Sequence, residues 1–354
     1  MPKSINIAKL NQRELNERES DILRQIVQLY ILKASPIGSR FLSKFAENEI
    51  KLSPATLRNT MADLEELDYI SHPHTSAGRV PTDKGYRFYV NTISKIEKLN
   101  KKEILTVQDS LINTNQDAVY KNASKILGML SKYLGIVQFP NIRDLTVQKI
   151  ELIELSSAKI LVVVALESNI IRTVTIEADF ENDIQQLDAI SGYLNERVSG
   201  KSLNFIRENF RDIINDLTLK NAPLIRLFTD SVDKIFARET SSDRVAITGT
   251  HHLLNYPEFE DLERVRGVIE LIENEDVIIH LLEQLDDSNK VQVYIGKELN
   301  NNTLQQYSLI KSTYKVGTAC GTIGLIGPKR MNYSKMIALV QYVSDILSGN
   351  IDLN

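Results

Sequence analysis

Residues 53–64 have the sequence Ser-Pro-Ala-Thr-Leu-Arg-Asn-Thr-Met-Ala-Asp-Leu, and this stretch decides the fold of the N-terminal hundred residues. The serine can cap a helix, and the proline after it loses no hydrogen bond at the first helical position. Leu57, Met61 and Leu64 then recur at i, i+4 and i+7, the spacing of a buried helical stripe. The stretch therefore predicts a helix that begins at Pro54.

The face of this helix opposite the buried stripe carries small and polar side chains. It comprises Ala55, Thr56, Arg58, Asn59 and Ala62, with Ser53 at the helix start. Asn can recognise adenine, Arg can recognise guanine or phosphate, and Ala or Thr methyl groups can contact thymine. Acidic residues fall in the second half, so only the N-terminal half can approach phosphates. The pattern favours a DNA recognition helix over the alternative, a polar helix face in solvent.

The residues before this helix predict the rest of a helix-turn-helix. Asn16 and Glu19 have capping-box spacing and open a helix that ends before Pro36. A short second helix follows, with Phe41, Leu42 and Phe45 on its buried side. A helix, a turn and a capped helix form the helix-turn-helix pattern.

The residues after the helix predict a wing. A short strand at 69–70 and a turn at 76–78 precede Arg79, which can enter a minor groove or bind a phosphate. Thr82 can cap a fourth helix, whose Lys84 and Arg87 can extend the phosphate contacts.

Two histidines in the wing admit two interpretations. His72 and His74 share a face if the segment is a strand, which is one way to place two metal ligands. No third ligand stands at useful spacing, so a phosphate contact or a structural hydrogen bond is favoured.

Several of these segments resemble the heat-inducible transcription repressor family (HrcA). The resemblance rests on residues 37–40, 53–59 and 64–65, on the long run 73–79 with 81–87, and on 324–333. It adds Ser39, Arg40 and Thr75 to the expected DNA contacts. Asp68 departs from the family, which tends to place Gly there, but Asp tolerates a left-handed backbone well.

The remaining residues predict an α+β arrangement. Helices are expected at 97–135 (with a break at 113–115), 183–198, 200–240, 261–272 and 331–347; strands at 147–155, 160–166, 170–176, 277–282, 291–295, 304–314 and 321–326. The resemblance implies a winged-helix domain at 1–98, a GAF-like antiparallel-sheet domain at 99–199 and 256–354, and an inserted, mostly helical dimerisation domain at 200–255.

Composition limits the function. The net charge is −4, yet residues 1–100 carry +3 and the rest −7, as expected when one part binds phosphates. The single cysteine, Cys320, excludes an internal disulfide and is expected to be buried. No apolar run is long enough to span a membrane, so a cytoplasmic protein is expected. The spacing of glycines 317, 321, 324 and 327 favours tight turns and strand packing over a phosphate loop.

Three function classes follow. The favoured one is a repressor that binds double-stranded, inverted-repeat operator DNA as a homodimer; the resemblance implies chaperone operons as targets and a GroE-type chaperonin as modulator. A small-molecule-sensing winged-helix regulator is the alternative. An enzyme is not expected, because no nucleophile–base pair, metal-ligand set or phosphate loop is evident, and no cofactor is expected.

Overall fold

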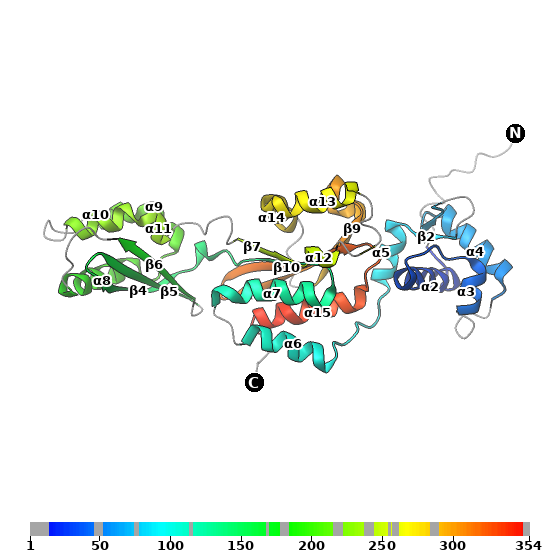
Figure 1. Cartoon of the computed structure of the whole chain (residues 1–354), viewed down its shortest axis with the longest axis horizontal. Helices are drawn as coiled ribbons and strands as arrows, with labels where there is room; N and C mark the ends of the chain where they lie inside the picture. The colour runs from blue at the N-terminus through cyan, green and yellow to red at the C-terminus, as the bar shows by residue number, and fades with distance from the viewer. Residues whose placement is uncertain are drawn as a thin grey trace.

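The computed structural model describes residues 14–45, 52–73, 78–112, 116–167, 170–177, 184–214, 222–236, 244–253, 256, 262–283 and 290–349. These residues form three units along an elongated molecule (Figure 1). We call them the N-terminal unit (14–91), the central unit (101–139 and 244–349) and the outer unit (142–236). The mixed α+β composition and the antiparallel pairing confirm the predicted fold class at this level.

The N-terminal unit contains four helices and a two-stranded sheet. In chain order these are α2 (Glu17–Lys33), α3 (Ser39–Phe45), α4 (Pro54–Glu66), β1 (Ile70–Ser71), β2 (Val80–Pro81) and α5 (Asp83–Asn91). The predicted capping box is present, because Asn16 and Glu19 each accept a hydrogen bond from the other's backbone. Asp68 has φ = 62°, so the left-handed turn after α4 forms with Asp in place of Gly.

The central unit is built on a five-stranded antiparallel sheet with the order β7-β3-β10-β9-β8. Its strands are β3 (Leu134–Gln138), β7 (Val245–Thr248), β8 (Gln292–Ile295), β9 (Tyr307–Val316) and β10 (Ala319–Pro328). Helices α6 (Lys101–Ile112), α7 (Gln116–Ser131) and α15 (Tyr333–Leu347) lie on one side of the sheet, while α13 (Leu262–Glu273) and α14 (Glu275–Glu283) lie on the other (Figure 1). The short elements α12 (Thr250–Leu253), η6 (Gly296–Leu299) and η7 (Asn302–Leu304) complete it.

The outer unit has its own sheet and its own hydrophobic core. Strands β4 (Val147–Ser156), β5 (Lys159–Leu166) and β6 (Ile171–Glu177) form the predicted antiparallel meander after the short turn η1 (Ile142–Asp144). One face of this sheet packs against α8 (Ile184–Val198), α9 (Leu203–Ile213) and the segment formed by α10 (Ala222–Asp230) and α11 (Val232–Phe236).

This grouping differs from the predicted domain boundaries. The meander shares a core with the helices after residue 200 and is not part of the five-stranded sheet, so a boundary at residue 200 falls inside the outer unit. The five-stranded sheet instead takes β3, whose first two residues fall at the end of the predicted helix 97–135, and β7, which lies in the predicted inserted domain 200–255.

Other local predictions need correction. The strand expected at 277–282 lies in α14, where Ile278, Ile279, Leu281 and Leu282 are buried at helical spacing. Cys320 and Phe45 are exposed rather than buried. The expected helix break at 113–115 lies outside the described residues.

The glycines of the β9–β10 hairpin have the expected packing roles. Gly317 has φ = 63° in the turn, and a Cβ on Gly321 would lie 2.4 Å from the Tyr314 ring. Turns and close strand packing therefore account for these positions.

Candidate nucleic-acid interface

The exposed face of α4 is the centre of the candidate site. Leu57, Met61 and Leu64 are buried as predicted, while Ala55, Arg58, Asn59 and Ala62 are exposed. Neither Arg58 nor Asn59 makes a side-chain hydrogen bond or ion pair within the part of the chain that is described. The helical geometry therefore brings together the residues that the periodicity predicted.

The start of α4 is capped in a way that fixes its first turn. The Ser53 hydroxyl accepts a hydrogen bond of 3.2 Å from the backbone N–H of Thr56, and the two hydroxyl groups lie 2.9 Å apart. Ser53 is exposed and Thr56 is half-buried. Because the first N–H groups of a helix lack intrahelical partners, this end of α4 carries a partial positive charge that favours a phosphate.

Helix α3 and the acidic half of α4 border this face. Ser39 is half-buried and Arg40 is exposed, both in the first turn of α3. The carboxylates of Asp63 and Glu66 are exposed on the second half of α4. The exposed charge on α4 therefore changes from basic to acidic along the helix, as the sequence predicted.

Two residues of the predicted wing have partners inside the protein. Arg79 Nη2 lies 2.8 Å from Glu65 Oε2, and His72 Nδ1 contacts the other oxygen of the same carboxylate. Arg79 is also joined to Ile37 by two backbone hydrogen bonds, which tie the wing to the segment before α3. His72 thus has a structural partner, whereas His74 and Thr75 lie outside the described residues.

The basic residues of α5 also have partners inside the protein. Lys84 donates a hydrogen bond of 2.8 Å to the carbonyl oxygen of Leu67 at the end of α4, and its ammonium lies over the Tyr69 ring. Arg87 forms an ion pair with Glu298 of the central unit. The structure therefore gives both residues intramolecular partners, which the sequence analysis missed because no local pattern identifies them.

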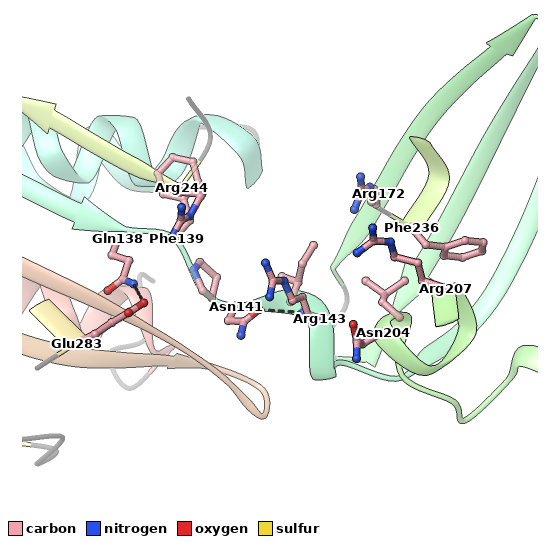
Figure 2. A pocket seen from close by; sticks show the side chains of 13 residues that line it. Gln138, Phe139, Asn141, Arg143, Arg172, Asn204, Arg207, Phe236, Arg244 and Glu283 are labelled. Carbon is pink, nitrogen blue, oxygen red and sulfur yellow. Dashed lines mark hydrogen bonds between the residues drawn. The ribbon is translucent and has the colours of Figure 1, made fainter. Parts of the chain in front are cut away.

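A second candidate site is a cleft between the central and outer units. Figure 2 shows Arg172 and Arg207 on the outer-unit side, Arg244 and Glu283 on the central-unit side, and Arg143 between them. Its volume is about 150 Å³, below the roughly 300–1,000 Å³ typical of small-molecule sites.

Carboxylates already neutralise part of this cleft. Arg207 donates to Asp233 at 2.8 Å, and Arg244 lies 3.2 Å from Asp276. The small volume and these ion pairs make the cleft a weaker candidate than the face of α4.

The described residues contain neither a membrane-spanning helix nor a metal-binding cluster. No helix among them has the length and apolar character needed to cross a lipid bilayer. They also contain no cluster of three or more His, Cys, Asp or Glu side chains arranged to bind a metal ion.

Comparison with known proteins places the chain in a family. A family model described as the HrcA protein C-terminal domain matches residues 117–337. A heat-inducible transcription repressor HrcA of Chlorobium phaeobacteroides (strain BS1) is 35% identical over 96% of this chain and 99% of that protein. The same-named protein of Chlorobium chlorochromatii is 35% identical over 97% of this chain and 99% of its own length.

The fold also has a solved counterpart. A crystal structure described as that of a hypothetical protein matches with a TM-score of 0.66 at 23% identity, covering 95% of this chain and 98% of that one. The curated repressors match nearly the whole chain, and the family model covers more than half of it. The chain therefore belongs to the HrcA family of heat-inducible transcription repressors.

Proposed function

We propose that this protein represses heat-shock chaperone operons by binding an inverted-repeat operator as a homodimer. The observation that carries the proposal is the exposed N-terminal half of α4, where Arg58 and Asn59 have no partner among the described residues while Leu57 and Met61 anchor the opposite side. Unpaired Arg and Asn side chains on a capped helix are suited to base edges in a major groove.

The N-terminal unit then acts as a winged helix. Arg58 and Asn59 read bases, and the methyl groups of Ala55, Thr56 and Ala62 contact thymine. A second set of contacts positions the protein on the DNA backbone, from Ser53 and the N-terminus of α4 and from Ser39, Arg40, His74 and Thr75. The other four predicted contacts, His72, Arg79, Lys84 and Arg87, have intramolecular partners. We assign the first three to holding the N-terminal unit together and Arg87 to attaching it to the central unit.

A test of operator binding compares the chain's own chaperone promoter with unrelated DNA of the same length. We expect binding at least about 1,000-fold tighter to the promoter at physiological salt, the lower end for specific DNA-binding proteins. Equal affinity for the two DNAs contradicts the proposal.

A dimer is required because one winged helix reads too few base pairs for genomic specificity. Two copies can present their α4 helices to successive major grooves, roughly 34 Å apart. The central unit supplies the GAF-like α+β domain that the family resemblance implies, and the outer unit supplies the dimerisation domain.

The open face of the β4–β5–β6 sheet is the surface we propose for dimerisation. Ile153 pairs across strands with Leu161, and Ile171 pairs with Ala165, so these side chains share the face opposite α8 and α9. Ile153 and Ile171 are 44% and 55% exposed. The same face also carries the exposed ion pair of Lys149 and Glu151. Exposed isoleucines beside charged groups favour burial of this face against a second copy.

The dimer surface can be tested with a matched pair of variants. Ile171→Asp is expected to shift the protein from dimer to monomer in sedimentation, because association buries the new carboxylate. Leu105→Asp, at an equally exposed leucine (57%) on α6, is the control and should remain dimeric. A dimeric Ile171→Asp protein contradicts this assignment of the interface.

The third part of the proposal is regulation by a GroE-type chaperonin, and it is supported by family membership alone. Free chaperonin is expected to keep the repressor active, and unfolded proteins that occupy the chaperonin are expected to relieve repression. Operator occupancy measured with and without chaperonin tests this, and equal occupancy counts against it.

A further inference from the structure

The N-terminal unit is attached to the central unit by two ion pairs that α5 contributes. Figure 1 shows α5 between the N-terminal helices and the central sheet. Asp83 and Arg87 lie one turn apart on α5, so both side chains emerge on the same side of the helix. This side faces the edge strand β8 and the turn η6 of the central unit.

Arg87 forms the first connection. Its Nε donates to Glu298 Oε1 at 2.8 Å, its Nη2 donates to Glu298 Oε2, and the same nitrogen reaches the carbonyl oxygen of Val293 at 2.5 Å. Glu298 is itself held by a 2.9 Å hydrogen bond from the backbone N–H of Ile295. A bidentate Arg–carboxylate pair whose carboxylate is held in place fixes the relative orientation of the two groups as well as attracting them.

Asp83 forms the second connection, with the opposite charge. Its Oδ1 pairs with Lys329, and its Oδ2 accepts a hydrogen bond of 3.1 Å from the backbone N–H of Lys297. Gly296 has φ = 57°, and a Cβ there would lie 2.2 Å from Asp83 Oδ2. The absence of a side chain at Gly296 thus leaves room for this carboxylate.

An apolar contact lies between the two ion pairs. The rings of Tyr86 and Tyr333 are buried, with centroids 6.2 Å apart. The Tyr333 hydroxyl is fixed by hydrogen bonds to Ser308 and to the carbonyl oxygen of Lys329. α5 therefore contributes one acidic and one basic group, and the central unit contributes a partner of opposite charge for each. Only one orientation of the two units forms both ion pairs.

The same helix also holds α4. Lys84, between Asp83 and Arg87, donates to the Leu67 carbonyl at the C-terminal end of α4. A rotation of α5 on the central unit must therefore move α4 with it. The two stretches on which much of the family resemblance rests, 81–87 and 324–333, meet at this junction.

We propose that Asp83 and Arg87, with Lys329 and Glu298, are positioning residues that set the angle of the N-terminal unit and so the spacing of the two α4 helices in the dimer. They act on operator recognition without touching DNA. The inference rests on the proposed function, because spacing matters only if two such units bind one operator.

The test is a charge-exchange cycle of Arg87→Glu, Glu298→Arg and the double variant. Each single variant sets like charges against each other and is expected to weaken binding to the inverted repeat by about tenfold or more, as for close interfacial charge pairs. The double variant restores the opposite charges and is expected to bind within about threefold of the unmodified protein. Thermal unfolding of each variant confirms that the N-terminal unit is folded.

Two readouts separate positioning from a DNA contact. Binding to an isolated half-site should stay within about twofold for every variant, since one unit suffices there. The single variants should distinguish less well than the unmodified protein between the original operator and an operator whose half-sites are moved apart by two base pairs. An equal loss of affinity for the half-site and for the full operator overturns the inference, and so does a double variant whose operator affinity does not recover. If the unmodified protein does not distinguish the operator from unrelated DNA, the proposed function itself fails.

Discussion

Replacing Arg58 with alanine is the most direct test of the α4 face. The guanidinium is exposed and has no hydrogen-bond or ion-pair partner within the described residues, so its removal takes no contact from the folded protein. Alanine is also the best helix former. The free energy of unfolding should therefore change by less than about 0.5 kcal/mol, as for surface substitutions away from special features.

The effect on operator binding should be large by contrast. A bidentate contact to a base contributes roughly 1–3 kcal/mol of discrimination, and a dimer makes the contact twice. The loss is then roughly 2–6 kcal/mol, or about 30-fold to 20,000-fold in affinity. Binding to unrelated DNA depends on phosphate contacts and should fall far less.

Fluorescence anisotropy with labelled operator and labelled unrelated DNA measures both affinities, and thermal unfolding measures stability on the same samples. Asp63→Ala, on the acidic half of α4, is the matched control and should retain operator specificity. Unchanged operator affinity in Arg58→Ala, with an unchanged melting temperature, means that the outer face of α4 does not read the DNA.

Three other substitutions test the surrounding structure. Gly85→Ala should destabilise the N-terminal unit by about 1–3 kcal/mol, because its Cβ would lie 2.2 Å from a backbone carbonyl oxygen, whereas Gly38→Ala has open space and should be neutral in the same melting experiment. Arg79→Ala should leave the salt dependence of DNA binding unchanged, since the Glu65 carboxylate on α4 already neutralises the Arg79 guanidinium. If the slope of log affinity against log salt concentration is reduced by about 0.9 for each Arg79 removed, Arg79 contacts a phosphate instead. The hydrogen bond from Lys335 holds the pKa of Glu103 below its ordinary value, so Glu103→Gln should lower stability at neutral pH, and the difference from the unmodified protein should vanish as acid protonates the carboxylate.

Local chemistry allowed much of the N-terminal unit to be predicted. The cap at Asn16, the Ser53-Pro54 helix start and the stripe of Leu57 and Leu64 are signals within one or two helical turns, and each is present in the structure. The exposed face of α4 followed from the same periodicity, because burying one side of a helix fixes which residues lie on the other.

Outside the N-terminal unit, short apolar runs do not distinguish a strand from a buried helix. Residues 277–282 suit a strand or a buried helix equally well by composition, and packing on the central sheet made them helical. Strand β3 follows a helix so closely that its apolar residues extended the helical pattern. Its partners β10 and β7 come much later in the chain, and no local signal identifies strands so distant.

The helices of the N-terminal unit, the face of α4 and the family could be recognised along the chain, because they depend on neighbouring residues or on motifs that can be compared directly. Only the tertiary structure decided that the meander forms a separate unit and that Arg79 and Arg87 have carboxylate partners. Glu298 lies 211 residues from Arg87, and such an ion pair is specified by how two units pack together rather than by any pattern along the chain. A sequence does not distinguish a basic side chain that can bind a phosphate from one that forms an ion pair with a carboxylate of the same protein. Only three-dimensional proximity distinguishes the two.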